Sequence, residues 1–124
     1  MAVPPIVDTP VFAQTYDAVA TTFYTRTLPV NSFVNIYLQV VAVRPSNGDS
    51  KTWFITAKVG RRSAGAILVN STNIFTPIAD AGASAWTAAI VVSGNDAQVQ
   101  FTGQASATIS WQAHVYAMVI TENI

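Results

Sequence analysis

Carboxylates are the side chains through which this sequence could most directly perform catalysis. The acidic residues are Asp8, Asp17, Asp49, Asp80, Asp96 and Glu122. Hydrolysis of a glycosidic bond usually requires two carboxylates about 5 to 10 Å apart, but each of these acids falls in a predicted turn, arm or tail. The preference of aspartate for turns explains Asp49 and Asp96. We therefore expect no catalytic residue, and the chain is predicted not to be an enzyme.

The single histidine, His114, lies in the middle of the last predicted strand. A Ser-His-Asp triad would need it as the base, but no nucleophile-elbow motif precedes it. A zinc site needs three or four ligands, and a chain with one histidine and no cysteine does not supply them. The stretch GRRSAG, residues 60–65, matches no phosphate-binding or dinucleotide-binding pattern. We expect no cofactor and no metal, and we expect His114 to be hydrogen-bonded or to lie at a subunit contact.

The charge of the chain is balanced and sparse. Six basic residues offset six acidic ones, and charged residues make up 10% of the chain, against about 25% in typical globular domains. Arg61 and Arg62 form a basic pair, whereas nucleic-acid binding normally needs a basic stripe or face. We expect no nucleic-acid partner, and we assign the two arginines to an inter-subunit ion pair or a solvated loop. The sparse charge indicates a surface rich in Ser, Thr, Asn and Gln or, as we favour, one covered by other subunits.

Neither a membrane span nor a signal peptide is predicted. No apolar run approaches the roughly 18 residues that a membrane-spanning helix needs. The first ten residues, MAVPPIVDTP, lack a positively charged start and contain three prolines. We expect no membrane partner and no export by a signal peptide.

Two hairpin signals organise the chain into antiparallel strands. Gly94-Asn95 and Asn47-Gly48 are typical two-residue turns between alternating runs. The first turn predicts inward pairs of Val92 with Ala97, Ile90 with Val99, Ala88 with Phe101 and Trp86 with Gly103. The second turn predicts inward pairs of Ala42 with Trp53, Val40 with Ile55, Leu38 with Ala57 and Ile36 with Val59. The side chains predicted to face a core, rather than to form a platform for sugars, are Trp53, Trp86 and Trp111.

The opposite faces of these strands are too apolar for a surface that meets only water. Their outward side chains include Tyr37, Val41, Phe54, Tyr116 and Met118. Exposed apolar patches of this kind mark contact surfaces or a covering segment.

Residues 1–20 are predicted to form an extended arm. Pro4, Pro5 and Pro10 argue against a central strand or a helix. The apolar side chains of the arm are Val3, Ile6, Val11 and Phe12. We expect the arm to lie either on its own sandwich or on a neighbouring subunit. Residues 21–124 are predicted as one all-β domain, a jelly-roll-like sandwich of two antiparallel sheets.

Four blocks of the sequence resemble a known group of proteins. The blocks are VNIYLQVVAVRPSNGDSKTWFITAKVGRR, SAGAILVNS, SAWTAAIVVSGND and VQFTGQASATISWQAHVYAMV. They are similar to small bacteriophage virion domains, found in capsid decoration or cement proteins and in the tips of tail fibres and spikes. The resemblance covers roughly residues 32 to 120 and depends on the spacing of Trp86, Gly103, Ile109 and Trp111. The last strand departs from it, because Tyr116, Met118 and Ile120 stand where those domains usually carry charges.

The resemblance implies a β-sandwich that assembles on a phage particle as a homotrimer, in contact with phage capsid or tail proteins. Our first interpretation is a non-enzymatic capsid decoration protein that is assembled in the host cytoplasm and stabilises the shell by binding it. The alternative is a receptor-binding module of a tail fibre or spike, in which residues 45–50 and 80–84 touch a host glycan or surface protein. The expected subunit or capsid interface comprises Val3, Ile6, Val11, Phe12, Tyr37, Val41, Phe54, Arg61, Arg62, His114, Tyr116 and Met118.

Overall fold

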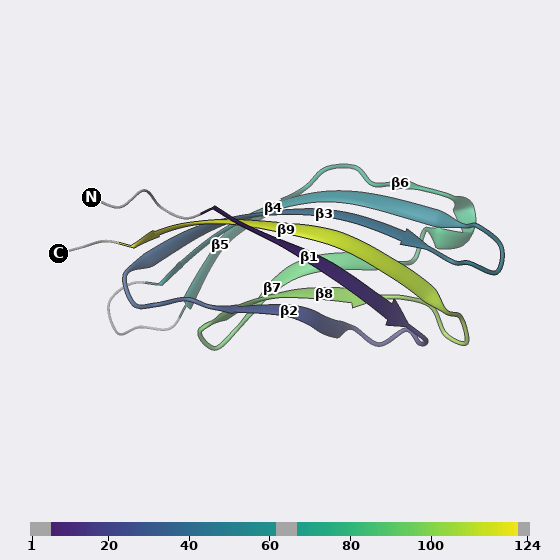
Figure 1. The fold of residues 1–124 in the computed structure, drawn as a ribbon, viewed down its shortest axis with the longest axis horizontal. Helices are drawn as coiled ribbons and strands as arrows, with labels where there is room; N and C mark the ends of the chain where they lie inside the picture. Colours follow the sequence, from purple (N-terminus) through teal and green to yellow (C-terminus); the bar gives the residue numbers. More distant parts are fainter. Residues whose placement is uncertain (1–5, 62–66, 122–124) are drawn as a thin grey trace.

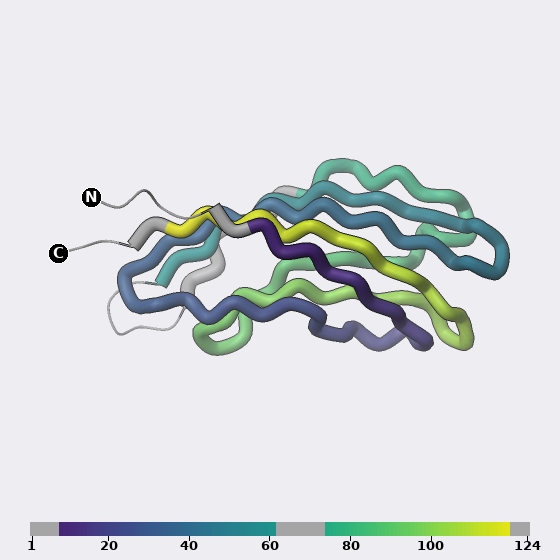
Figure 2. Tube along the Cα trace, in the orientation of Figure 1, coloured from purple at the N-terminus to yellow at the C-terminus, as the bar shows by residue number. Residues whose placement is uncertain are grey.

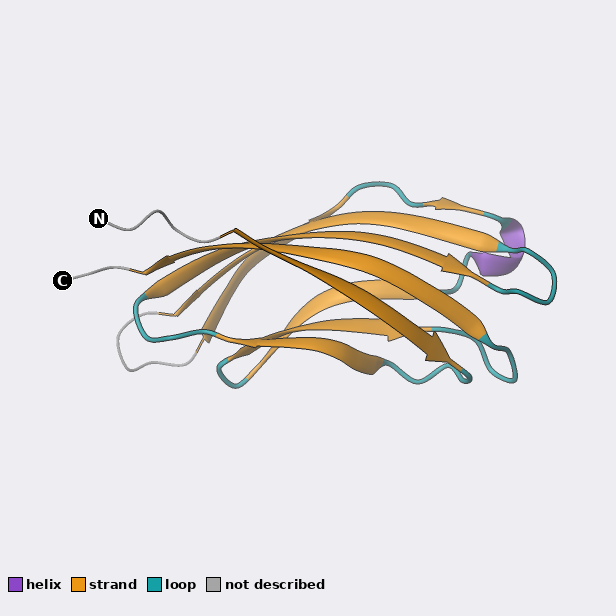
Figure 3. Ribbon diagram, viewed as in Figure 1, coloured by secondary structure: helices purple, strands orange, loops and turns teal. Residues whose placement is uncertain are grey.

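The computed structural model describes residues 6–61 and 67–121, which fold into two layers of antiparallel strands (Figure 1). The larger sheet has the order β1-β9-β3-β4-β5, with β6 also paired to β4, and the smaller sheet has the order β2-β8-β7. The elements are β1 (Ile6–Thr15), β2 (Thr21–Thr27), β3 (Ser32–Val43), β4 (Ser50–Arg61), β5 (Ile67–Ile74), β6 (Ile78–Ala79), η1 (Ala81–Ala83), β7 (Thr87–Ser93), β8 (Asp96–Thr102) and β9 (Ile109–Thr121). Figure 3 shows η1 as a short helical turn among the strands and loops. The predicted two-sheet antiparallel sandwich is confirmed.

The segment predicted as an arm supplies the edge strand of the larger sheet. Strand β1 pairs with β9 from Ile6 opposite Met118 to Thr15 opposite Ile109. The sequence left two positions open for this segment, on its own sandwich or on a neighbouring subunit. In the structure it lies on its own sandwich. Pro10 lies opposite His114, and an edge strand tolerates proline because one of its sides needs no N–H donor. Figure 2 shows the chain crossing from β1 to the smaller sheet at one end of the molecule.

The hairpin of β7 and β8 has the predicted register. Val92 pairs with Ala97, Ile90 with Val99, and Ala88 with Phe101. Gly94 has a φ of +58, the left-handed conformation that a tight two-residue turn requires. The ladder ends at Thr87 opposite Thr102, and Thr15 of β1 fills the space beside the Gly103 Cα.

The hairpin of β3 and β4 departs from the predicted register by two residues. Val40 pairs with Trp53, Leu38 with Ile55, and Ile36 with Ala57. The cause is a longer loop: the backbone N–H groups of Asn47 and Gly48 both donate to the carbonyl of Arg44. Pro45 suits the second position of such a turn because its ring already fixes φ. A shift of two residues keeps the same side chains inward, so the predicted core face is correct although its pairs are wrong.

A stack of aromatic rings joins the two layers. Trp53 of β4 lies 5.4 Å from Trp111 of β9, measured between ring centroids, and Phe101 of β8 lies 4.6 Å from Trp111 with an interplanar angle of 3°. Phe23 of β2 continues the stack at 5.4 Å from Phe101. Stacked pairs of this kind add about 0.5–1.5 kcal/mol each beyond the burial of their area. As predicted, all three tryptophans are buried, the third being Trp86.

A buried lysine, Lys51, lies two residues before Trp53 in β4. It occupies the inward face opposite Ala42 and is 8% exposed. Its Nζ donates to the carbonyl oxygens of Ser84 at 2.9 Å and Trp86 at 2.8 Å, and it lies 5.3 Å from the centroid of the Trp53 ring. Burial lowers the pKa of Lys51 below its ordinary value of 10.5. These hydrogen bonds therefore link the loop after η1 to the start of β4.

Candidate functional site on the outer face of the larger sheet

Aromatic side chains gather on the outer face of the larger sheet. The registers place Tyr116 of β9 opposite Tyr37 of β3, and Phe54 of β4 opposite Gln39 of β3. Ring centroids lie 6.1 Å apart for Tyr37 and Tyr116, 6.1 Å apart for Tyr37 and Phe54, and 5.9 Å apart for His114 and Tyr116. We call these side chains the aromatic row: His114, Tyr116, Tyr37 and Phe54.

The aromatic row is open to solvent and bordered by hydrogen-bonding groups. Phe54 is 40% exposed, and Tyr37, Tyr116 and His114 are half-buried. The polar side chains on the same face of the central strands include Asn35, Gln39, Thr56 and Gln112. This surface therefore combines flat apolar rings with amide and hydroxyl groups that lie on the same or neighbouring strands.

An ion pair ends the aromatic row at the edge strand. Asp8 Oδ1 lies 3.0 Å from His114 Nδ1, with side chains 50% and 40% exposed. The pair joins β1 to β9, and its exposure means that it adds at most about 1 kcal/mol to stability. The position of His114 agrees with the hydrogen-bonded histidine expected from the sequence. The carboxylate of Asp8 also adds a charged acceptor beside the rings.

Other predicted interface residues divide between the two faces of the larger sheet. Phe12, Val41 and Met118 are 73%, 47% and 44% exposed, and they share the outer face with the aromatic row. Val11 is a correction: it is 8% exposed and belongs to the core, because alternation along β1 turns it inward when Phe12 faces outward.

The described residues include only part of the arginine pair and of the N-terminal arm. Arg61 Nη1 donates to the carbonyl oxygen of Leu28 at 2.8 Å, so this guanidinium binds within its own chain, at the end of β4. Ile6 pairs with Met118 at the start of β1. Val3 and Arg62 lie outside the described residues.

A shallow hollow of about 480 Å³ lies where β1 ends and β9 begins. Its lining residues are Phe12, Ala13, Gln14, Tyr16, Ser110 and Trp111. We call it the end hollow. Sequence reasoning missed Gln14 and Tyr16, because only the pairing of β1 with β9 brings an N-terminal segment beside Ser110.

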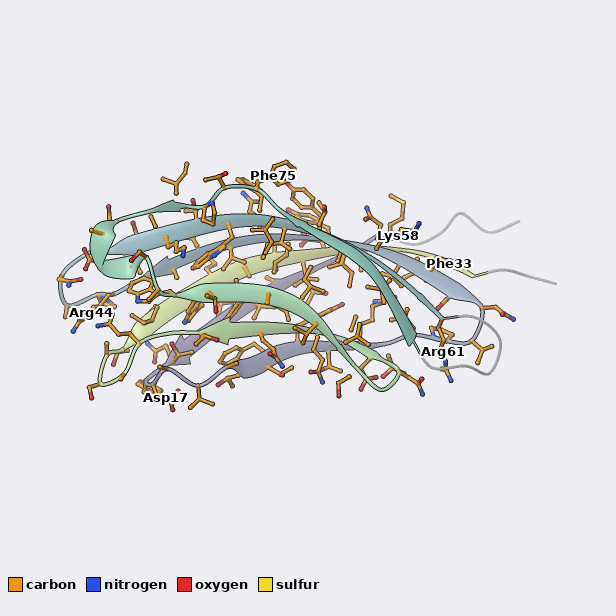
Figure 4. The ribbon with its side chains drawn as sticks, turned by 180° about the vertical axis from the view of Figure 1, so that it is seen from behind. Asp17, Phe33, Arg44, Lys58, Arg61 and Phe75 are labelled. Atoms are coloured by element: carbon orange, nitrogen blue, oxygen red, sulfur yellow. The ribbon has the colours of Figure 1, made fainter. Side chains whose placement is uncertain are left out.

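The two loops proposed from the sequence as contact loops, residues 45–50 and 80–84, meet at the same end of the molecule. The backbone N–H of Ser50 donates to Asp80 Oδ2 at 2.9 Å, and the backbone N–H of Asp80 donates to the carbonyl oxygen of Ser50 at 3.0 Å. Figure 4 shows Arg44 and Asp17 at this end and Arg61 at the opposite one. Because Ser110 at the start of β9 pairs with Val43 at the end of β3, the end hollow lies at the same end of the molecule as both loops.

Four acids of the described residues hydrogen-bond to neighbouring backbone or side-chain groups. The pairs are Asp17 with Val19, Asp49 with Asn47, Asp80 with Ser50 and Asp96 with Thr27. Within residues 6–61 and 67–121, no three His, Cys, Asp or Glu side chains gather in a group that could hold a metal ion. The same part of the chain contains no helix of the length and apolarity needed to cross a membrane.

Comparison with known proteins gives low similarity to phage tailspikes. No protein-family model and no curated protein matches the chain. It is similar to the tailspike protein of Acinetobacter baumannii phage AM24, at 8% identity and a TM-score of 0.47, over 95% of this chain and 26% of that one. It is also similar to tailspike protein gp49 of Acinetobacter baumannii bacteriophage Fri1, at 12% identity and a TM-score of 0.38, over 93% of this chain and 20% of that one.

One of these comparisons overturns an expectation from the sequence. The prediction that the chain is not an enzyme is corrected, because the Fri1 tailspike is described as a capsular polysaccharide depolymerase. That activity belongs to a whole protein of which the chain spans 20%. Both similar proteins are phage tailspikes. Neither is described as a capsid decoration protein.

Proposed function

We propose that this chain is a glycan-binding module of a phage tail fibre or spike, and that the aromatic row is its binding platform. The observation that carries the proposal is the alignment of three exposed or half-buried rings and an imidazole across neighbouring strands, with centroid separations of 5.9 to 6.1 Å. Amide, hydroxyl and carboxylate groups border these rings on the same face.

The chemistry of this surface suits a sugar. A pyranose ring has an apolar face of C–H bonds and an edge of hydroxyl groups. The face of a tyrosine or phenylalanine ring packs against the C–H bonds, while Gln39, Gln112 and Asp8 supply donors and acceptors for the hydroxyl groups. An open row suits a polymer whose successive units meet the same surface, whereas small ligands are usually enclosed in a pocket.

The position of β1 favours a glycan over a capsid shell as the partner. The interface expected from the sequence included Ile6, Val11 and Phe12 of the N-terminal arm, yet Ile6–Thr15 pairs along its whole length with β9. Gln39 and Thr56 also interrupt the apolar surface around the aromatic row, whereas obligate subunit interfaces are more continuously apolar. Both features support contact with a hydrated partner such as a glycan.

Binding to a panel of purified bacterial capsular polysaccharides, measured by biolayer interferometry, tests the proposal. We expect at least one polysaccharide to bind, and Tyr37→Ala and Tyr116→Ala each to weaken it at least tenfold. Thr25→Ala, on the exposed outer face of the smaller sheet, is the matched control and should bind like the unaltered chain. Release of reducing ends is followed in the same samples, because one similar tailspike is described as a depolymerase. Failure of every polysaccharide to bind, or equal binding by the tyrosine variants, would overturn the proposal.

A further inference from the structure

We infer that the end hollow is a subsite for one uncharged pyranose unit of the glycan, an inference that rests on the proposed function. It lies on the same face of the sheet as the aromatic row, toward the end of β1. Ser110 and Tyr116 are six positions apart on β9, which is about 20 Å of strand. A polymer lying across the aromatic row could therefore reach the end hollow with a later unit.

Two exposed rings flank the end hollow. Phe12 is 73% exposed and Tyr16 is 61% exposed, although both belong to residue types that are usually covered. Phe12 lies on the outward face of β1, and Tyr16 follows the last residue of that strand. Each ring offers an apolar face to the C–H bonds of a sugar.

A chain of hydrogen bonds lies between the two rings. The Tyr16 hydroxyl donates to Gln14 Oε1 at 2.7 Å, and Gln14 Nε2 donates to Ser110 Oγ at 3.4 Å. This chain uses one of the two Gln14 Nε2 hydrogens and leaves the Ser110 hydroxyl hydrogen available. The end hollow therefore presents both donors and acceptors, and each hydroxyl group of a sugar also has both.

A buried hydrogen bond supports the end hollow from beneath. Trp111 Nε1 donates to Thr15 Oγ1 at 2.9 Å, and both side chains are buried. Thr15 in turn fills the space beside Gly103, where a Cβ would collide with it. These contacts hold the end of β1 in place, so Gln14 and Tyr16 are positioned before a ligand arrives, which lowers the entropic cost of binding.

The charge of the lining defines the class of sugar. The end hollow is lined by aromatic, amide, hydroxyl and alanine side chains, without a carboxylate, ammonium or guanidinium group. A sugar carboxylate is bound most strongly by a charged donor such as arginine, and the lining of the end hollow offers none. A neutral hexose or N-acetylhexosamine therefore fits, and a uronic or sialic acid does not.

Saturation-transfer NMR with methyl glucoside, methyl galactoside, N-acetylglucosamine and glucuronic acid tests the inference on the full chain. We expect signal from at least one neutral sugar and none from glucuronic acid, with Phe12→Ala and Tyr16→Ala each reducing the signal at least fivefold. Ile74→Ala, an exposed apolar position on the edge strand opposite β1, is the matched control and should leave it unchanged. Both ring side chains are exposed, so thermal unfolding should show that these variants remain folded.

The two levels of the hypothesis fail differently. If a capsular polysaccharide binds and Tyr116→Ala weakens it, while Phe12→Ala and Tyr16→Ala have no effect in either assay, the end hollow is not a subsite and the proposed function stands. If glucuronic acid binds as well as the neutral sugars, the assignment to uncharged sugars is wrong. If no polysaccharide and no sugar binds, both the proposed function and this inference are overturned.

Discussion

The two outward faces of the sandwich differ in chemistry although antiparallel strands build both. On the smaller sheet, Gln100 Nε2 donates to Thr22 Oγ1 at 3.1 Å, and Thr22 Oγ1 donates to Gln98 Oε1 at 3.4 Å. On the larger sheet, the outward side chains include the rings of Tyr37 and Phe54. Polar side chains on the outward face of the smaller sheet hydrogen-bond to one another, whereas the outward face of the larger sheet exposes aromatic rings to water. The comparison teaches that the fold requires only the inward faces to be apolar, so the rings on one outward face call for a functional explanation.

Both faces depend on the same aromatic stack, so the largest effect should come from removing its centre. Trp111→Ala removes ring contacts with both layers and the hydrogen bond to Thr15. We expect a loss of about 3–5 kcal/mol in the free energy of unfolding, measured with urea. Phe12→Ala, an exposed ring on the same sheet, should cost about 0.5 kcal/mol or less. Equal costs for the two variants would contradict the role of the stack.

A substitution at Gly103 should destabilise the end of β1 more than the rest of the larger sheet. A Cβ at this position would meet Thr15 and the carbonyl oxygen of Asp17, so Gly103→Ala should cost about 1–3 kcal/mol by overpacking. Hydrogen exchange should quicken most for the amides at the end of β1. Uniformly faster exchange in both sheets would show that the effect is not local.

Replacement of the buried lysine should change both stability and its dependence on pH. Lys51→Met leaves the carbonyl oxygens of Ser84 and Trp86 without their donor, at a cost of about 1–3 kcal/mol at neutral pH. Because burial lowers the pKa of Lys51, the folded chain releases this proton at lower pH than the unfolded chain. In that interval the unfolded chain binds more protons, so this lysine makes stability rise as pH increases toward 10.5.

Urea unfolding at a series of alkaline pH values measures this lysine effect. The difference in stability between the unaltered chain and Lys51→Met should grow toward the alkaline limit of the interval. A difference that stays constant with pH would show that the folded and unfolded chains titrate this lysine alike.

Exchanging one side chain between the two outward faces should alter binding more than stability. Tyr37→Thr gives the larger sheet a residue typical of the smaller one, and we expect a change of about 1 kcal/mol or less in the free energy of unfolding. Polysaccharide binding should fall at least tenfold in the assay proposed above. The reverse exchange, Thr25→Tyr, should leave binding unchanged, since a single ring on the smaller sheet has no neighbours in a row. Gain of binding by that variant would show that the arrangement of rings does not matter.

The smallest effect should come from the ion pair at the end of the aromatic row. Asp8→Asn removes the carboxylate that lies 3.0 Å from His114. Because both side chains are largely solvated, we expect a change within about 0.5 kcal/mol. A loss above about 2 kcal/mol would mean that the pair, rather than the strand pairing, holds β1 to the sheet.

The sequence predicted the faces well, because alternation is a local property. Val40 and Leu38 face inward whether the hairpin register is as expected or shifted by two, and the outward positions Tyr37 and Phe54 follow directly. The turn at Gly94 also gave the correct pairs. The turn near Asn47 did not, because the carbonyl of Arg44 accepts two N–H groups in a longer loop, and this closure is not evident from the Asn-Gly pair.

The end hollow and the buried lysine could not be predicted, because they depend on contacts between distant parts of the chain. Thr15 and Trp111 are 96 positions apart, and sequence alternation does not say which strand lies beside β1. Lys51 faces inward by the same alternation that turns Trp53 inward, but its two carbonyl partners lie in a different loop. Local alternation therefore predicts which side chains face outward, whereas the sites on those faces depend on which strands pair with one another.

The proline in β1 has a consequence for molecules crowded together. Pro10 sits in the middle of an edge strand, where any further strand would need an N–H from that position to continue the ladder. The missing donor discourages neighbouring molecules from merging their sheets side to side along this margin. Copies held at high local concentration would then stay separate, with their broad surfaces still free to meet a partner.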